Sequence, residues 1–414
     1  MYKNTKNVTF LIFDKIIYGI CSLTIIYILT NTLSIHQFGI YQYAITLTGL
    51  ICITLNLIDE KVIKRYFANN MVDRAITATL QIKIMLAICI FSGLLFYDHF
   101  FGVMRDLYVL MSFILIGTII NSLASIIHIY FDYYQKSYVR LTSSFFAQLT
   151  NVSVHIGLIN LNADYKYLTI GYVMASLATV FVYIYFLKIQ KIKLNISKMN
   201  FAGLQNFMQQ SIPFGLATIV HTLYYRSDIV MIEFFLEFEH VGIYSVATNL
   251  VSLSIILVYP AQTALFKTFS DYYQSDKHQF VAFYAKYTKL MTLLGLLIAA
   301  VILVSFVPFR KLFLPDQYSE IDTFLLILLF GAVLQYNAFL RSSFLVLIGQ
   351  GRILLIAQIA TLFLNLLLNT LLIPCLGLAG ASIATLISLF FNLLLSNIFF
   401  YQTRIVFQIQ TLRY

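Results

Sequence analysis

Residues 291–309 read MTLLGLLIAAVILVSFVPF, a run that contains no charged side chain. A helix needs about 20 mainly apolar residues to cross the roughly 30 Å of hydrocarbon in a lipid bilayer. The run therefore predicts a transmembrane helix over residues 288–309. Because comparable runs recur along the whole chain, this stretch sets the interpretation of the rest.

The other candidate spans share this length and apolar character. They lie near 11–33, 39–58, 78–97, 107–130, 140–160, 167–189, 211–235, 241–265, 321–346, 353–373 and 380–400. The chain has 414 residues, of which 60% are hydrophobic and only 11% charged, whereas a soluble protein carries roughly 25% charged residues. With a mean hydropathy of +0.85, much of the apolar surface must face lipid. We expect an all-α membrane protein of about twelve transmembrane helices.

The basic residues predict the orientation of these helices. An even number of spans puts both termini on one side of the membrane. If that side is the cytoplasm, most of the 27 Lys and Arg residues fall in cytoplasmic segments. The opposite segments hold only Arg105, Lys166, Arg310 and Lys311, and Arg226 and Arg341 fall within spans. This asymmetry follows the positive-inside rule, so we expect cytoplasmic termini and no nucleic-acid partner, despite a net charge of +10.

The sequence shows no sign of a metal site, a cofactor or an enzyme active site. The cysteines Cys21, Cys52, Cys89 and Cys375 lie in or beside apolar runs, without CxxC or Cys/His ligand spacing. They are interpreted as packing residues. The connecting segments are short and leave no extramembrane domain to carry catalytic residues.

Two motifs occur once in each half of the chain. FGIYQYA at 38–44 returns as VGIYSVA at 241–247, and GYVMASLAT at 171–179 returns as GLAGASIAT at 377–385. The nearly equal offsets predict two six-helix bundles, 1–200 and 201–414, related by a parallel internal repeat that would allow alternating access. The simpler interpretation is that both motifs are small-residue helix-packing sequences.

The same segments resemble a known family. Gly39-Ile40-Tyr41, the stretch 212–250 with Pro213 and Asp228, and GLAGASIAT at 377–385 are similar to O-antigen/oligosaccharide flippases (Wzx-type polysaccharide exporters) of the MATE-like superfamily. The resemblance implies export of undecaprenyl-diphosphate-linked oligosaccharide across the bacterial inner membrane, from the cytoplasmic to the periplasmic leaflet. The partners would be this lipid-linked oligosaccharide, a proton or sodium ion, and the lipid bilayer. Whether a polysaccharide polymerase and a chain-length regulator also dock is left open.

Three charged residues within spans are the strongest site candidates, because an unpaired charge at that depth costs at least about 2.5–3.5 kcal/mol. We expect Arg226 and Arg341 to attract the diphosphate or acidic sugars of the substrate. Asp228 would be the protonatable coupling group, with His221 and His155 as weaker candidates. The helical period places Asp228 and His221 on one face and Arg226 roughly opposite.

Neutral polar residues in the spans suit a carbohydrate, which offers hydroxyls to hydrogen-bond and apolar ring faces to stack on. We assign Tyr224, Asn249, Gln358 and Asn365 to the substrate cavity. Gln358 and Asn365 share one helical face with Thr361 and Asn369. The alternative for each neutral residue is that it hydrogen-bonds one helix to another.

Other functions are weighed against the same residues. A cation-coupled multidrug exporter would favour acidic groups over arginines in its cavity. A membrane polysaccharide polymerase or glycosyltransferase would need clustered carboxylates or arginines in a sizeable loop, which the short loops do not offer. A purely structural membrane protein would not explain charges inside the spans. The sequence does not identify the sugars or the coupling ion.

Overall fold

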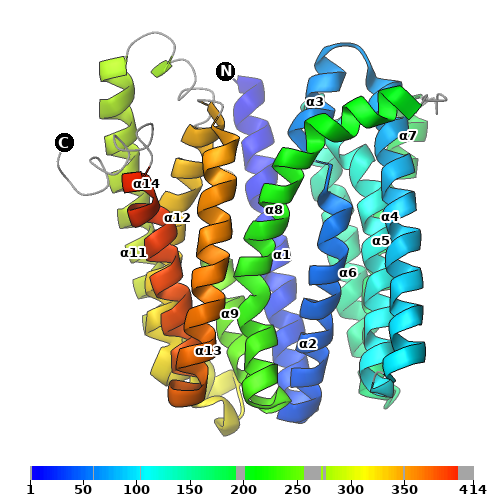
Figure 1. Ribbon diagram of the computed structural model, residues 1–414. Helices are drawn as coiled ribbons and strands as arrows, with labels where there is room; N and C mark the ends of the chain where they lie inside the picture. The colour runs from blue at the N-terminus through cyan, green and yellow to red at the C-terminus, as the bar shows by residue number, and fades with distance from the viewer. Residues whose placement is uncertain are drawn as a thin grey trace. The chain divides into compact units, whose positions relative to one another are not determined.

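The computed structural model describes residues 2–58, 60–102, 104–192, 201–255, 272–273, 277–347 and 350–399. Within these ranges the chain forms helices and contains no strand (Figure 1). Each predicted span falls on a helix, although the part of 241–265 beyond Ile255 lies outside the described residues. The predicted all-α membrane fold is confirmed.

Packing contacts divide the chain into two units. Unit 1 comprises Met1–Leu33 and Ile40–Thr222, and unit 2 comprises Ser34–Gly39 and Leu223–Tyr414. The division falls inside α8 (Phe201–Phe235), because Phe207 near the start of that helix packs into the core of unit 1. The grouping of spans into 1–200 and 201–414 therefore stays a prediction.

Unit 1 contains six long helices, of which α2 also contributes its first residues to unit 2. The long helices are α1 (Tyr2–Thr32), α2 (Ile35–Cys52), α4 (Val72–Phe101), α5 (Arg105–Tyr133), α6 (Ser137–Asn160) and α7 (Ile170–Ile189). The shorter elements are η1 (Ile53–Asn56), α3 (Glu60–Ala68) and η2 (Tyr165–Tyr167). Helices α5 and α6 both pack extensively on α7, and α1 packs on α6.

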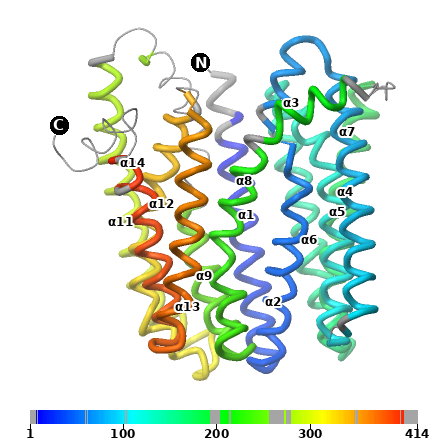
Figure 2. The backbone as a smooth tube through the Cα atoms, viewed as in Figure 1, coloured from blue at the N-terminus to red at the C-terminus, as the bar shows by residue number. Residues whose placement is uncertain are grey.

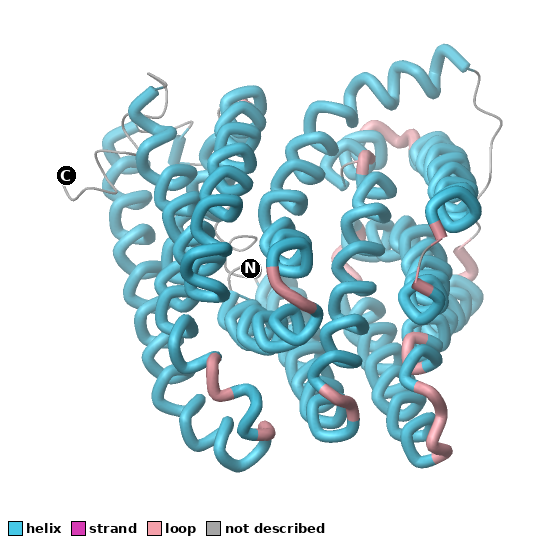
Figure 3. The backbone as a smooth tube through the Cα atoms, turned by 60° about the horizontal axis from the view of Figure 1, so that its bottom comes forward, coloured by secondary structure: helices cyan, strands magenta, loops and turns pink. Residues whose placement is uncertain are grey.

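Unit 2 continues from the second half of α8. Its other helices are α9 (Phe238–Ile255), α11 (Lys277–Phe313), α12 (Ile321–Leu347), α13 (Gly351–Phe390) and α14 (Ser396–Phe399), with a 3-10 turn η3 (Asp316–Tyr318) and a π-helical segment η4 (Phe391–Leu395). Helix α12 packs against α9, α11 and α13, so it forms the centre of this unit. Figure 3 shows short loops that join helices at their ends within the described residues.

Eight described helices are long and apolar enough to cross a membrane by length and composition. The helices α6, α8 and α9 are not among them, yet each coincides with a predicted span. Helices α6 and α8 carry His155 and Asp228 respectively. Two of these three helices thus hold candidate coupling residues, as expected where polar groups face the interior of a bundle.

The short helix α3 was not predicted. It is strongly amphipathic and buries Val62, Ile63, Tyr66 and Phe67 against α4 and α5. On its polar face, Lys64 pairs with Glu60 one turn earlier. Nine residues are too few for a span, which is why a search for long apolar runs does not detect this helix.

Helix α13 reverses direction at Gly377 and therefore contains two predicted spans (Figure 2). Gly377 has φ 58° and ψ −136°, a backbone conformation that only glycine adopts readily. A Cβ atom on Gly380 would lie 2.2 Å from the carbonyl oxygen of Leu372, so the two arms of the reversal touch through bare backbone. Both glycines of GLAGASIAT are thus required by this reversal.

A second close approach occurs in unit 2 between the start of α2 and the start of α9. A Cβ atom on Gly39 would lie 1.7 Å from the carbonyl oxygen of Phe238. A Cβ on Gly242 would lie 3.1 Å from the carbonyl oxygen of Ile35. The glycines of both GIY motifs therefore allow these helices to approach each other closely.

We predict that Gly39→Ala destabilises the protein by about 1–3 kcal/mol, because the added methyl group forces the backbone of α2 away from α9. Gly49→Ala is the matched control, since a Cβ at Gly49 in the same helix meets no atom within 4 Å. Thermal unfolding in detergent, followed by circular dichroism, measures the difference. Equal melting temperatures for the two variants would contradict this packing.

Candidate functional site

Asp228 lies in the second half of α8 and is 5% exposed. Its Oδ2 atom accepts a hydrogen bond from the Tyr244 hydroxyl at 3.1 Å and another from the Thr385 hydroxyl. Its Oδ1 atom accepts from Asn369 Nδ2 at 3.1 Å. Helices α8 and α9 and both arms of α13 therefore meet at one carboxylate.

Sequence analysis did not identify two of these three donors. Tyr244 is the tyrosine of the second GIY motif, and Thr385 is the last residue of GLAGASIAT. Each motif was interpreted as a sign of the repeat or of helix packing, and in unit 2 both also place a hydroxyl on Asp228. The position of Tyr244 and Thr385 in these motifs was the available signal. The sequence, however, does not show that either residue contacts Asp228.

A second layer of side chains supports this site. Asn365 is fully buried, and its Oδ1 accepts hydrogen bonds from Ser227 Oγ at 2.8 Å and from Asn369 Nδ2 at 3.0 Å. These bonds orient Asn369 toward Asp228. Asn365, predicted to line the substrate cavity, is not among the residues that line the cavity beside Asp228, and it contacts the Asn369 side chain that donates to Asp228.

The site allows a carboxylate to be held or to take up a proton. Three donors satisfy the ionised form, which makes the buried charge tolerable. The hydroxyl groups of Tyr244 and Thr385 also accept hydrogen bonds, so a protonated Asp228 can donate to either one after that hydroxyl rotates. Both protonation states therefore find partners without movement of the backbone.

A cavity within unit 2 borders this carboxylate. Among the residues that line it, the polar ones are Tyr225, Arg226, Asp228, Tyr244, Thr248, Asn249, Ser252, Gln335, Ser382 and Thr385. Arg226 and Asp228 both border the cavity, although helical spacing alone predicts roughly opposite directions. The Arg226 guanidinium lies 5.8 Å from the ring centre of Tyr225. Within the described part of the chain, no carboxylate lies within ion-pair distance of Arg226.

Arg341 occupies a different environment. It is 2% exposed, and its Nε, Nη1 and Nη2 atoms donate to Asn397 Oδ1, Asn392 Oδ1 and Ser396 Oγ at 2.6, 3.1 and 2.8 Å. These partners lie on η4 and α14, so Arg341 ties α12 to the π-helical end of the last span. It does not line the cavity beside Asp228. All three partners are neutral.

The remaining predicted site residues are distributed as follows. Asn249 lines the cavity, whereas Tyr224 and Gln358 are buried in unit 2 outside its lining. His221 lies in the part of α8 that belongs to unit 1. His155 is fully buried in unit 1.

In unit 1, His155 is contacted by the first copies of both motifs. The Tyr41 hydroxyl lies 3.0 Å from His155 Nε2, and His155 Nδ1 lies 2.8 Å from the Asn151 carbonyl oxygen. A carbonyl only accepts, so Nδ1 carries a proton and the neutral ring accepts from Tyr41 through Nε2. A Cβ on Gly171 would lie 2.7 Å from the ring. Both ring nitrogens are thus satisfied by the neutral form.

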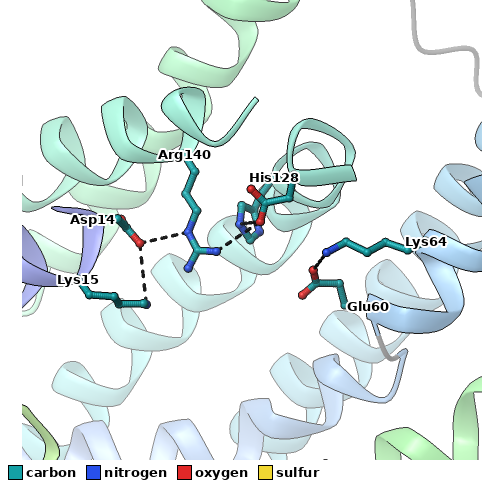
Figure 4. A network of polar contacts seen from close by, with 7 residues as sticks. Asp14, Lys15, Glu60, Lys64, His128 and Arg140 are labelled. Carbon is teal, nitrogen blue, oxygen red and sulfur yellow. Dashed lines mark hydrogen bonds and ion pairs between the residues drawn. The ribbon is translucent and has the colours of Figure 1, made fainter. Parts of the chain in front are cut away.

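Unit 1 also contains a charged cluster that the sequence analysis did not describe (Figure 4). Arg140 on α6 donates to Asp14 on α1 at 3.1 Å and to Asp132 on α5 at 3.3 Å. Lys15 lies 3.9 Å from Asp14, and His128 lies 2.9 Å from Asp132. One guanidinium thereby links three helices, and its partners come from runs that were treated as separate spans.

The comparisons with known proteins agree with this architecture. The family described as polysaccharide biosynthesis protein matches residues 4–273. No curated protein sequence matches the chain.

Solved structures of transporters share the fold. An inward-facing multidrug resistance MATE transporter of the MOP superfamily is 15% identical, with TM-score 0.76 and 95% of each chain covered. An outward-facing structure of such a transporter is 14% identical, with TM-score 0.69 over 99% of this chain and 96% of that one. A MOP superfamily transporter from Pyrococcus furiosus, described as having a binding pocket of reverse polarity, is 14% identical, with TM-score 0.70 over 100% and 96%.

These structural similarities show that the chain has the fold of a multi-pass membrane transporter. In the related structures the helices form two bundles. The family match covers well over half of the chain. The chain therefore belongs to the polysaccharide biosynthesis protein family and has the fold of the MATE-like superfamily, as its resemblance to the Wzx-type flippases predicted.

Proposed function

We propose that this protein is a flippase that moves undecaprenyl-diphosphate-linked oligosaccharide repeat units, as in O-antigen and lipopolysaccharide synthesis, from the cytoplasmic to the periplasmic leaflet of the bacterial inner membrane. The observation that carries the proposal is the cavity of unit 2, in a polysaccharide-biosynthesis chain with a transporter fold. It combines an arginine that has no ion-pair partner among the described residues with a carboxylate that hydrogen bonds already satisfy.

The cavity chemistry supports an anionic, hydroxyl-rich substrate. Arg226 offers a planar set of donors that suits a diphosphate or an acidic sugar. Asn249, Ser252 and Gln335 offer neutral hydrogen-bonding groups, and Tyr225 and Tyr244 offer rings to stack on sugars. A pocket with a few convergent polar groups among apolar ones is typical of ligand sites.

The same residues favour this substrate over a cationic drug, which is the second candidate because solved multidrug transporters share the fold. A cationic drug would need the Asp228 carboxylate, and three donors already surround that group. It would also approach the positive charge of Arg226, which costs binding energy in a medium of low dielectric constant.

Arg341 fits the proposal only in part. Its guanidinium is held by neutral side chains in this conformation, so it would reach a substrate only after leaving Asn392, Ser396 and Asn397. Its buried charge has no ion-pair partner within the described residues. Arg226 is therefore our primary candidate for the diphosphate, and Arg341 would act at another step of the cycle.

Asp228 is our candidate for ion coupling, by antiport of a proton. Transport coupled to an ion requires a group whose ion occupancy differs between two conformations. Asp228 is held from both arms of α13 and from α9, so a rearrangement of these helices changes its hydrogen bonds. His155 and His221 remain weaker candidates.

We predict that Arg226→Ala weakens binding of a synthetic polyprenyl-diphosphate oligosaccharide by about ten- to a hundredfold, the effect expected when a hydrogen bond to a charged group is lost. Arg226→Lys retains part of the affinity, because the charge remains and the planar fork is lost. Isothermal titration calorimetry in detergent measures both. Arg310→Ala, which removes the ion pair with Asp322 at the end of α11, is the control. Wild-type affinity in Arg226→Ala would remove this residue from the site.

We predict that Asp228→Asn abolishes substrate-dependent proton flux in proteoliposomes while binding of the same oligosaccharide stays near the wild-type level. The amide keeps the shape of the side chain and does not take up a proton. Its NH2 group replaces one acceptor oxygen, and the Tyr244 or Thr385 hydroxyl can accept a hydrogen bond from it after rotation. Asp322→Asn is the matched carboxylate control. Undiminished flux in Asp228→Asn would place the coupling group elsewhere, and His155 would be the next residue to change.

We predict cytoplasmic termini, because the basic residues are concentrated in the segments on that side. In a cysteine-free background, Asn195→Cys reacts with a membrane-impermeant maleimide only after cells are opened. Asn162→Cys, between α6 and α7, reacts in cells whose outer membrane alone is permeabilised. Labelling of Asn195→Cys from outside would reverse the proposed direction of transport.

A further inference from the structure

The first arm of α13 carries four polar residues on one face. They are Gln358, Thr361, Asn365 and Asn369, spaced three or four residues apart, and each is at most 7% exposed. Between Arg352 and Gly377 this arm contains no acidic, basic or histidine residue. We call these four residues the α13 polar stripe.

Hydrogen bonds between helices account for only part of the stripe. Asn365 and Asn369 contact Ser227 and Asp228 on α8. The Thr361 hydroxyl donates to the carbonyl oxygen of Ala357 in its own helix. Helix–helix bonding therefore explains Asn365 and Asn369, but not Gln358 or Thr361.

Two amide oxygens of the stripe lack a partner. Gln358 Oε1 and Asn369 Oδ1 are buried and accept no hydrogen bond from any described residue. A buried polar atom without a partner costs free energy, and buried polar groups in proteins generally bond to protein or to ordered water. The unpartnered amide oxygens at the two ends of the stripe therefore favour ordered internal water that donates hydrogen bonds to them.

The stripe extends from Asp228 toward one end of its helix. At 1.5 Å of rise per residue, Gln358 lies roughly 10 Å and Asn369 roughly 27 Å from the start of α13. Asn369 donates directly to Asp228 at 3.1 Å. The other end approaches Arg352, which the distribution of basic residues assigns to the cytoplasmic side.

We propose that the α13 polar stripe is a hydrated path along which protons move between Asp228 and the cytoplasmic end of α13. This inference rests on the proposed role of Asp228 in coupling. Internal water and the Thr361 hydroxyl both donate and accept hydrogen bonds, so a proton can pass along them while each oxygen receives one proton and releases another. The amides of Gln358 and Asn369 orient the water.

The surroundings make Asp228 the end point of this path. The titratable or charged groups near it are Tyr224, Tyr225 and Arg226 on its own helix and Tyr244 on α9. The described part of α13 presents amides and a hydroxyl to it. The stripe is neutral, so it relays a proton without retaining it, and Asp228 is the carboxylate that binds one.

The test measures how fast Asp228 exchanges protons, without any substrate. In reconstituted protein, infrared difference spectroscopy after a pH jump follows the carboxyl band that is absent from Asp228→Asn. We expect Gln358→Leu and Thr361→Val to slow the rise of this band about tenfold or more, because each removes a hydrogen-bonding group from the path. The pH midpoint of the band stays unchanged.

Thr370→Val is the matched control for Thr361→Val. The Thr370 hydroxyl also donates to a carbonyl of its own helix, that of Leu366, but it lies on the exposed face. Gln358→Met, which keeps the length of the side chain, replaces Gln358→Leu if the latter does not fold. Wild-type exchange rates in both stripe variants, or the absence of a titrating Asp228 band, would overturn the path.

The outcomes separate this inference from the proposed function. If Asp228→Asn retains proton flux, the coupling role is wrong, but the infrared rates still measure whether the stripe conducts protons. If Asp228→Asn loses flux and the stripe variants exchange at the wild-type rate, only the path is wrong.

Discussion

The structure of unit 2 depends on keeping one carboxylate in a medium that does not solvate it. Removing Asp228 from water carries a large penalty unless hydrogen bonds replace the lost hydration. Tyr244, Asn369 and Thr385 supply these bonds from α9 and both arms of α13. The relative positions of three spans are therefore linked to the charge on one side chain. A rearrangement of these spans would change the hydrogen bonds that reach the carboxylate, which is the property that the proposed coupling role requires.

The two arginines that the sequence placed inside spans have different environments, and the difference lies in their partners. Arg341 is surrounded by Asn392, Ser396 and Asn397, which makes it part of the packing of α12 against the last span. Arg226 faces a cavity without an ion-pair partner among the described residues. Sequence alone ranks both equally, since the cost of a charge at depth is the same for each. Only the three-dimensional neighbours separate a charge held by side chains of the protein from one that borders a cavity.

Much of the fold could be predicted because the bilayer limits the choice of element. Runs of mainly apolar residues predicted the spans that the described helices confirm, including the two that α13 joins at Gly377. The amphipathic α3 was missed because its four buried residues lie among charged ones. Periodicity showed that Gln358, Thr361, Asn365 and Asn369 share a face, and they do. It does not show which helix that face meets, so the donors Tyr244 and Thr385 and the link from Arg140 to Asp14 were not foreseen.

The reversal at Gly377 has a mechanical consequence. Asn369 precedes it and Thr385 follows it, and Gly380 brings the two arms into backbone contact with Leu372. No flexible linker separates the two arms, so neither arm can slide along the other without breaking the backbone contact between Gly380 and Leu372. The two arms would then move together as one rigid hairpin. Their hydrogen bonds to Asp228 lie near the turn, so a small rearrangement there would produce a larger displacement at the far ends of both arms. For the same reason this turn would tolerate an inserted tag poorly.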